Sequence, residues 1–383
     1  MLHNKFVITL LLSFTALLGW AQSDSSRLRI SLLTCTPGEP LYATFGHTAI
    51  RVTDSLENSD IVYNYGTFNF DDPGFYLKFV RGKLNYYLSA EYFQDFVYFY
   101  QYENRGITEQ VLQLGPSEKK QLQQALKTNL QPQNKFYQYD FFFDNCTTRA
   151  RDMVARYQDS TLPIKAVMPL GTSFREAIHL YLDKNHGDWN KLGIDILLGA
   201  PTDALMTAKQ MQFLPDNLMY SLDSLNGSHA IVASKKDLYP LPNPNNKAPL
   251  LTPLLLFSLL AVLIFLCGFA KAPRMRIFIN SFDGLFLFLT GLLGVILIFM
   301  WTATDHAMCR NNYNLLWAWP THLVMAFFVS SKKRWAKAYW GVVAVAMLLL
   351  LVAWFFLPQQ MNNALLPLVV LLAYRSGWRY FQK

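Results

Sequence analysis

The sequence has few cysteines and few charged residues for its length. The four cysteines among 383 residues are too few and too widely spaced for a disulfide framework or a CxxC zinc site; they are Cys35, Cys146, Cys267 and Cys309. We therefore expect no structural metal and no bound cofactor. Charged residues make up only 16% of the chain and hydrophobic residues 52%, which is more apolar than an ordinary soluble protein.

The apolar residues are not spread evenly along the chain. Up to about Lys247 the polarity is mixed, with Pro, Asn and Asp in turns, whereas the remainder is a succession of long apolar runs. This change predicts two domains, residues 22–247 and residues 248–383. An apolar run over residues 6–20 ends before Ala21, which predicts a secretory signal over residues 1–21, cleaved after Ala21. An uncleaved anchor is the alternative, and either form places residue 22 outside the cytoplasm.

The second domain contains five candidate membrane spans, at residues 249–270, 285–301, 313–330, 338–357 and 364–378. Lysines and arginines cluster after the first span, after the third span and at the end of the chain, whereas the two outer loops contain one such residue, Arg310. The positive-inside rule therefore places the C-terminus in the cytoplasm. Because the basic residues follow the membrane topology, the formal net charge of +8 does not indicate nucleic-acid binding.

Ionisable side chains lie near the outer ends of these spans. Asp305 and His306 are adjacent in the loop between the second and third spans, and His322 lies in the outer half of the third span. Ionisable groups at this depth are costly, so they are candidates for substrate binding or catalysis. A hydrogen-bonded structural role is the alternative for each.

The first domain has the pattern of an α+β fold. Alternating or apolar stretches predict strands at residues 27–33, 47–52, 61–65 and 111–114. Residues 117–131 have the spacing of an exposed amphipathic helix, with Ser117 as its cap.

The most informative segment of the first domain surrounds Cys146. An aromatic run ends at Asp144 and Asn145, which are both good helix caps, so we expect a helix to begin there. A thiol in the first helical turn feels the positive end of the helix dipole and the neighbouring Arg149, which favour the thiolate. A buried structural cysteine is the alternative.

His47 is the histidine that best matches this thiol. It follows Gly46, which permits close approach, and it begins a predicted strand. Surface positions are expected for the other histidines of this domain, His179, His186 and His229. A cysteine thiolate with a neighbouring histidine base is the minimum for thiol acyl transfer, and an amide or carboxylate would hold the ring. Asn64 on the next strand could do this, and Tyr63 on the other face of that strand is the alternative.

The sequence resembles proteins with the circularly permuted papain-like fold. It shares with them a histidine at a strand start, a polar residue on the next strand and Asn-Cys at a helix start. Lecithin:retinol acyltransferase has this fold, and NlpC-type peptidases share its architecture in rearranged order. More closely, the chain resembles the Lnb family, which are lipoprotein N-acyltransferases of Gram-negative bacteria. The resemblance covers nearly the whole chain and is carried by residues 33–38 (LTCTPG), 45–52 (FGHTAIRV), 63–68 (YNYGTF), 81–84 (RGKL), 144–149 (DNCTTR) and 192–195 (LGID).

The resemblance implies a multi-pass protein of the bacterial inner membrane with its thiol domain in the periplasm. It also implies transfer of an acyl chain from a phospholipid to the N-terminal amine of a diacylglyceryl-cysteine lipoprotein. Cys146 would carry the chain as a thioester, and His47 would deprotonate the thiol and later the incoming amine. Supporting or substrate-binding roles are expected for Tyr63, Asn145, Arg149, Cys35, Asp305, His306 and His322.

Two other functions remain open at this point. A membrane-anchored cysteine peptidase or amidase acting on cell-wall peptide needs the same Cys146 and His47. A noncatalytic envelope assembly protein is the second, in which Cys146 would pair oxidatively with Cys35 or Cys309.

Overall fold

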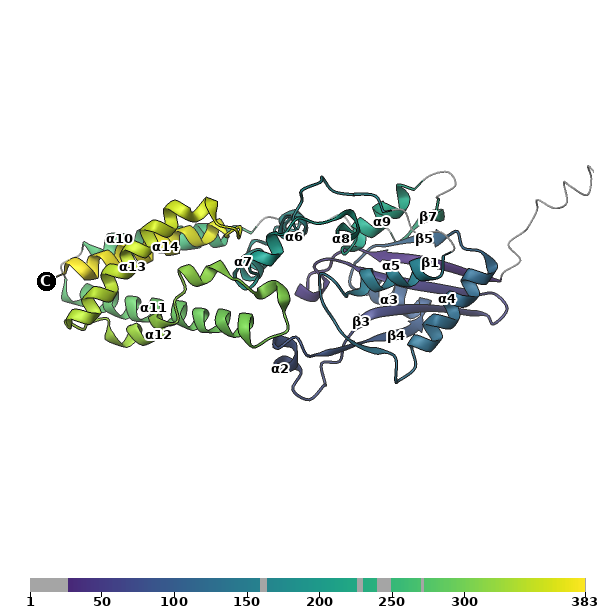
Figure 1. The fold of residues 1–383 in the computed structure, drawn as a ribbon, viewed down its shortest axis with the longest axis horizontal. Coiled ribbons are helices and arrows are strands. Elements are labelled where there is room, and N and C mark those ends of the chain that lie inside the picture. Colours follow the sequence, from purple (N-terminus) through teal and green to yellow (C-terminus); the bar gives the residue numbers. More distant parts are fainter. Residues whose placement is uncertain (1–26, 159–163, 226–229, 240–248, 270–271, 383) are drawn as a thin grey trace, which may run out of the picture.

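The computed structural model describes residues 27–158, 164–225, 230–239, 249–269 and 272–382. Two parts lie end to end along one long axis (Figure 1). Residues 27–239 form an α+β part, which we call the sheet domain, and residues 249–382 form a helical part, the helical domain. The general architecture is thus the predicted one. The predicted signal segment and the expected boundary at Lys247 lie outside the described residues.

The sheet domain is built on one antiparallel sheet. Over the described residues it has seven strands in the order β6-β4-β3-β2-β1-β5-β7. The strands are β1 (Leu28–Cys35), β2 (His47–Asp54), β3 (Ser59–Thr67), β4 (Asn85–Tyr92), β5 (Ile107–Leu112), β6 (Phe136–Gln138) and β7 (Val232–Tyr239). The central strands β1 and β2 pair along their whole length, with Cys35 opposite His47. This register places both side chains at the same end of the sheet.

Both faces of the central strands are buried, because helices cover each face. Side chains alternate along a strand, so Leu32 and Ile50 point to one face while Leu33 and Ala49 point to the other. The first face packs against α4 (Pro116–Asn129), α5 (Cys146–Arg156) and α9 (Pro215–Asp223), and the second against α3 (Phe93–Tyr102). Full burial of each large aliphatic side chain contributes about 1.5–3 kcal/mol.

Most of the strands and the helix near the thiol lie where the sequence predicts them. The strands predicted at residues 27–33, 47–52 and 61–65 correspond to β1, β2 and β3. The strand predicted at residues 111–114 was misplaced, because β5 ends at Leu112. The predicted Ser117 cap was wrong: α4 begins at Pro116, and the carboxylate of Glu118 accepts a hydrogen bond from the backbone N–H of Gly115.

The helical domain contains two helices long and apolar enough to cross a membrane, among the residues described: α11 (Pro273–Thr302) and Arg334–Phe356, which begins with α13 (Arg334–Ala353). The shorter helices of this domain are α10 (Pro253–Gly268), α12 (Thr321–Met325) and α14 (Leu366–Phe381). Asp283 of α11 forms ion pairs with Arg375 (2.8 Å) and Arg379 (2.6 Å) of α14. These buried pairs hold the first long helix against the last one.

The third predicted span, residues 313–330, is not one continuous helix. Pro320, which lacks an N–H group, precedes α12 and interrupts the helical pattern. The segment packs closely on α11, since a Cβ atom on Gly294 would overlap the carbonyl oxygen of Ala318. The segment consists of a 3-10 turn at Tyr313–Leu316, α12 and a second 3-10 turn at Ala326–Phe328.

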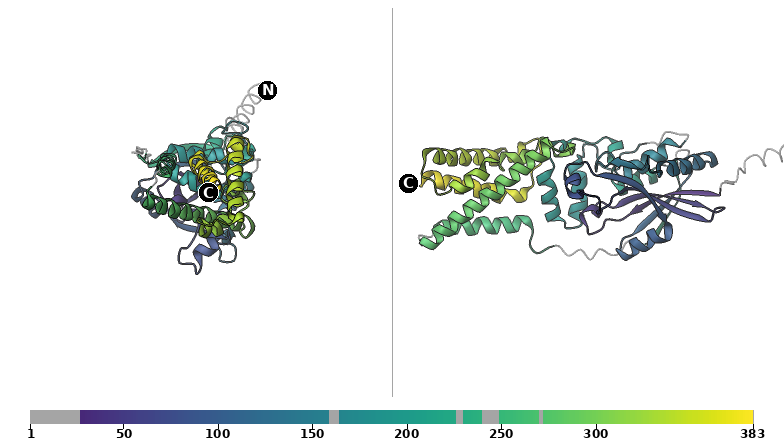
Figure 2. Two further views of the ribbon diagram at one scale, coloured as in Figure 1. Left: turned by 90° about the vertical axis from the view of Figure 1, so that its left-hand side faces the viewer. Right: turned by 90° about the horizontal axis from the view of Figure 1, so that it is seen from below.

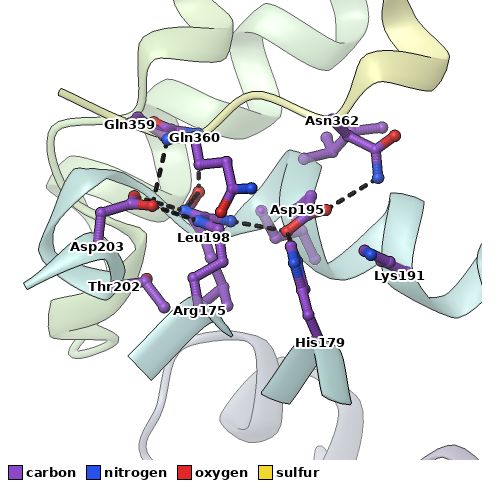
Figure 3. Close-up of polar contacts among 12 residues, drawn as sticks. Arg175, His179, Lys191, Asp195, Leu198, Thr202, Asp203, Gln359, Gln360 and Asn362 are labelled. Atoms are coloured by element: carbon purple, nitrogen blue, oxygen red, sulfur yellow. Dashed lines mark hydrogen bonds and ion pairs between the residues drawn. The ribbon is translucent and has the colours of Figure 1, made fainter. Parts of the chain in front are cut away.

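A buried ion-pair network joins the two domains (Figure 3). Arg175 is fully buried and donates hydrogen bonds to Asp195 (2.8 Å) and Asp203 (2.9 Å). From the loop before α14, Asn362 donates to Asp195 at 2.9 Å and Gln359 donates to the carbonyl oxygen of Leu198 at 3.0 Å. The network thereby fixes the helical domain to the elements α6 (Phe174–Lys184), α7 (Asp188–Leu197) and η2 (Ala200–Asp203), which are followed by α8 (Ala208–Met211).

Candidate active site

Cys146 is the first residue of α5. Its neighbour Asn145 caps this helix, and the Oδ1 atom of Asn145 accepts a hydrogen bond from the backbone N–H of Thr148 at 2.8 Å. The side-chain amide of Asn145 also donates to the carbonyl oxygens of Phe141 (2.7 Å) and Phe213 (2.8 Å). The cap therefore fixes the start of α5 and leaves the thiol at the positive end of the helix dipole, as the sequence predicts.

His47 is the first residue of β2, and the glycine before it controls where its ring lies. Gly46 has a φ of +80°, and a Cβ atom there would lie 2.5 Å from the carbonyl oxygen of Cys35. A side chain at this position would have to push β1 away. Because β2 begins at His47, the ring lies at the end of the strand, where it is hydrogen-bonded to the thiol of Cys146.

Asn64 on β3 holds the other side of the imidazole. The Nε2 atom of His47 lies 3.0 Å from the Oδ1 atom of Asn64. An amide oxygen can only accept, so Nε2 donates and Nδ1 is left to accept the thiol proton. Tyr63, the alternative in the sequence, packs instead in the core beneath α5. The structure thus brings Cys146, His47 and Asn64 into one hydrogen-bonded triad.

A fourth polar residue, which the sequence analysis missed, continues this triad. The side-chain amide of Asn64 donates a hydrogen bond to the Oε1 atom of Glu91 at 2.8 Å. Glu91 lies on β4, where the register pairs it with Val62, two residues before Asn64. This contact orients the amide so that its oxygen points to His47. The alternation of residues along β4 would have placed Glu91 on the same face, but only after the pairing of β3 with β4 was known.

The electrostatic surroundings favour charge separation between the thiol and the imidazole. Burial raises the pKa of Cys146, but the charge and hydrogen bond of His47, with a hydrogen bond from the backbone of Thr48, outweigh it and bring the pKa down from 9.0 to about 7. Burial lowers the pKa of His47, but the Cys146 thiolate and the contact with Asn64 outweigh it, so this pKa is raised. The pair is therefore poised to form thiolate and imidazolium near neutral pH.

Cys35 lies beside this pair but differs from Cys146 in its ionisation. It ends β1 opposite His47, and its thiol is hydrogen-bonded to Tyr100 of α3. Burial raises the pKa of Cys35 to about 12, so its thiol stays protonated at neutral pH. Both cysteines are free thiols in the structure, as are Cys267 and Cys309. Of the two thiols at this end of the sheet, Cys146 is the one that can act as a nucleophile.

Arg149 holds the segment that leads into α5. Its guanidinium forms two hydrogen bonds to the carboxylate of Asp144, at 2.6 and 2.7 Å. It also stacks on Tyr137, with 3.4 Å between the guanidinium carbon and the ring centroid. Arg149 therefore positions the turn that carries Cys146.

The three outer membrane-domain residues singled out in the sequence lie away from the triad contacts. The Nε2 atom of His306 lies 3.1 Å from the carbonyl oxygen of Phe79, and Asp305 lies 3.9 Å from Lys83. Both ring nitrogens of His322 bond within the helical domain, to Tyr339 (2.6 Å) and to the carbonyl oxygen of Trp317 (3.1 Å).

His179 is not at the surface, contrary to the prediction. It is buried, and its Nε2 atom lies 2.8 Å from Asp195 in the network that joins the domains (Figure 3). The partner lies on another helix, so the sequence around His179 gave no sign of it. His186 has a φ of +51° in a turn after α6, and His229 lies outside the described residues.

The triad has the composition that nucleophilic acyl transfer requires. Such a reaction needs a cysteine whose pKa lies near neutral pH, a histidine that can take and return a proton, and an amide that orients the histidine ring. Over the described residues, no group of three or more His, Cys, Asp or Glu side chains is arranged to hold a metal ion.

Two family models match the chain. Residues 18–174 match the Lnb N-terminal periplasmic domain, and residues 244–383 match the Lnb transmembrane domain. No curated protein and no solved structure matches. The two matches follow the same order as the sheet domain and the helical domain, and the first contains all three residues of the triad. These matches to the Lnb periplasmic domain and the Lnb transmembrane domain show that this chain is a member of the Lnb family.

Proposed function

We propose that the protein is a lipoprotein N-acyltransferase that works through a thioester on Cys146. Family membership supports a reaction of this type, and the hydrogen-bonded triad of Cys146, His47 and Asn64 is the observation that carries the mechanism. The order His, Asn, Cys along the chain also fits a circularly permuted papain-like domain. Both substrates, a phospholipid and a lipoprotein, are held in the membrane, so a thiol domain fixed to a helical domain can reach them without extracting them into water.

In the first half-reaction, the thiol proton of Cys146 passes to the imidazole of His47. The Sγ atom then attacks the ester carbonyl carbon of a phospholipid, forming the S–C bond as the C–O bond to glycerol breaks. His47 returns the proton to the glycerol oxygen, and a lysophospholipid leaves. Two easier steps thereby replace direct attack of an amine on an ester.

In the second half-reaction, the free N-terminal amine of a diacylglyceryl-cysteine lipoprotein attacks the thioester carbonyl. The N–C amide bond forms, the S–C bond breaks, and His47 accepts the proton that the amine loses. The products are the N-acylated lipoprotein and the Cys146 thiolate beside the His47 imidazolium, which is the charge pair that the surroundings favour. Asn64 keeps the ring in one orientation through both halves.

The direct test is to incubate the purified full-length protein with phospholipid labelled in its acyl chain, without an acceptor, and to measure the intact mass. We expect one acyl adduct on Cys146 that hydroxylamine removes at neutral pH. Cys146→Ser and His47→Ala should abolish it, and Cys35→Ala should retain it. If no adduct forms on Cys146 while Cys146→Ser protein still acylates lipoproteins, the mechanism is wrong.

A second experiment identifies the acceptor. Mass spectrometry of lipoprotein N-termini from cells with wild-type or Cys146→Ser protein should show the N-acyl group only with the wild type. Release of cell-wall peptides, with lipoprotein N-termini unchanged, would instead identify a peptidase or amidase.

A further inference from the structure

The helix α2 (Phe75–Val80) lies where the sheet domain meets the outer end of the membrane helices (Figures 1 and 2). The carbonyl oxygen of Arg81 accepts a hydrogen bond from the backbone N–H of Asp305 at 3.0 Å, and that of Phe79 lies 3.1 Å from His306. The long apolar helix α11 ends at Thr302, only three residues before Asp305. These contacts place α2 at the height of the phospholipid headgroups on the periplasmic side.

Around α2 the sheet domain exposes a group of large apolar side chains. Tyr76 is 77% exposed and Leu77 is 62% exposed, and the exposed group also includes Phe70, Phe79 and Val80. Three basic residues lie within or directly after this helix: Lys78 pairs with Asp72, Lys83 lies 3.9 Å from Asp305, and Arg81 is exposed. A cluster of this kind is unfavourable in water but is what binds an interface of acyl chains and anionic headgroups.

A row of aromatic rings leads from α2 to the thiol. The centroid distances are 6.1 Å from Phe79 to Phe75, 5.9 Å from Phe75 to Phe68, 5.4 Å from Phe68 to Tyr86 and 4.5 Å from Tyr86 to Tyr139. At its inner end the row reaches Gly66: a Cβ atom there would lie 3.4 Å from Tyr139 and 3.6 Å from the Cβ atom of Cys146. Because Gly66 has no side chain, both the ring of Tyr139 and the Cβ atom of Cys146 pack directly against its backbone.

The contour of this row is longer than one leaflet of hydrocarbon, which is about 15 Å. Phe68, Tyr86 and Tyr139 are each partly exposed, so their rings offer accessible surface as well as mutual contacts. Rigid aromatic walls provide large apolar contact area with little loss of side-chain entropy.

We propose that residues 68–80, continued by Tyr86 and Tyr139, form the acyl-chain binding surface of this protein. The exposed side chains of α2 insert into the periplasmic leaflet, and one acyl chain of a phospholipid lies along the aromatic row with its ester at Cys146. This inference rests on the proposed function for the identity of the reaction, but the binding surface can be tested without the chemistry.

The binding test uses full-length Cys146→Ser protein in lipid nanodiscs that contain a phospholipid with a photoactivatable diazirine in its acyl chain. After irradiation, we expect cross-links in peptides covering residues 68–86 and Tyr139. The double variant Leu77→Ser/Phe79→Ser should lower this labelling about fivefold or more, because two apolar anchors are lost. The matched control is Tyr98→Ser/Tyr102→Ser on α3, where both tyrosines are at least as exposed, and it should leave the labelling unchanged.

The kinetic test compares the same substitutions in protein that retains Cys146. The Leu77→Ser/Phe79→Ser variant should form acyl-enzyme from bilayer phospholipid about tenfold more slowly, while alkylation of Cys146 by water-soluble iodoacetamide keeps its wild-type rate. Slowed alkylation would instead mean damage to the site and would overturn the assignment.

The outcomes separate the two proposals. Labelling of residues 68–86 without any acyl-enzyme in the wild type would keep the binding surface and refute the transferase chemistry. Acyl-enzyme formation at the wild-type rate in the α2 variant, with labelling spread equally over α3, would refute the binding surface and leave the chemistry standing.

Discussion

Replacing His47 by alanine should change the reactivity of Cys146 in a way that the structure makes quantitative. With its pKa at about 7, about half of the Cys146 thiol is ionised at pH 7. Without His47, the burial that raises this pKa is no longer offset by the imidazole, so the pKa should rise to its ordinary value of 9.0 or above. The two pKa units correspond to about 3 kcal/mol of lost thiolate stabilisation.

The thiolate fraction at pH 7 should therefore fall at least about fiftyfold, and alkylation by iodoacetamide should slow by the same factor. Because His47 lowers the pKa of Cys146, the wild-type thiol should react above about pH 7 and lose reactivity below it. The thiol of the variant should react only at about pH 9 or above. The assay is the rate of alkylation between pH 5 and pH 10 in protein carrying Cys267→Ala and Cys309→Ala, read by intact mass.

His186→Asn provides the matched control, because asparagine tolerates the left-handed turn at this position and the residue lies in a turn after α6. This variant should keep the wild-type pH profile. If the reactivity of His47→Ala protein has its midpoint at the same pH as the wild type, the imidazole is not what stabilises the thiolate, and the electrostatic account of the site fails.

Four further predictions concern the support of the site and its placement. Asn64→Ala should slow acyl-enzyme formation by up to about a hundredfold without changing the thermal unfolding midpoint, because the base loses its orientation; an unchanged rate would show that the ring is held otherwise. Gly46→Ala should cost about 1–3 kcal/mol in the free energy of unfolding, measured with denaturant, and wild-type stability would mean that β1 yields freely. Asp195→Asn, which leaves the buried Arg175 with less compensation, should cost about 3–5 kcal/mol, seen as faster proteolysis of the domain junction in detergent; protection equal to the wild type would contradict this. A reporter active only in the periplasm and fused to the C-terminus should be silent, and activity there would reverse the topology.

The sequence predicts the parts of the site whose signals are local. Gly46 before His47 and Asn145 before Cys146 mark the start of a strand and of a helix, and both elements begin where these signals stand. Local signals suffice because each side chain is placed by its own turn or cap.

Other features depend on partners distant in sequence, and these the sequence could not predict. Glu91 joins the triad only through the pairing of β3 with β4, and His179 is buried because Asp195 lies on the next helix. The strands β4, β6 and β7 were likewise not predicted, since their residues mix polar and apolar types on half-exposed surfaces. Whether a polar residue is at the surface or in a network is decided by packing that no short window contains.

The break in the third predicted span has the same origin. Residues 313–330 are without Asp, Glu, Lys or Arg, which suggests a span, but Pro320 and the close approach of α11 at Gly294 divide the segment. An average of hydropathy over a sequence window carries no information on how closely a neighbouring helix packs.

The network around Arg175 also sets an order of events during synthesis. The sheet domain is made first, and Asp195 and Asp203 can pair with Arg175 as soon as α6 and η2 exist. Asn362 and Gln359, which complete the network, belong to the last loop before α14 and arrive only when almost the whole chain has been made. The network is therefore complete only when almost the whole chain has been made. A fragment that ends before this loop would leave a carboxylate oxygen of Asp195 without the hydrogen bond that Asn362 donates.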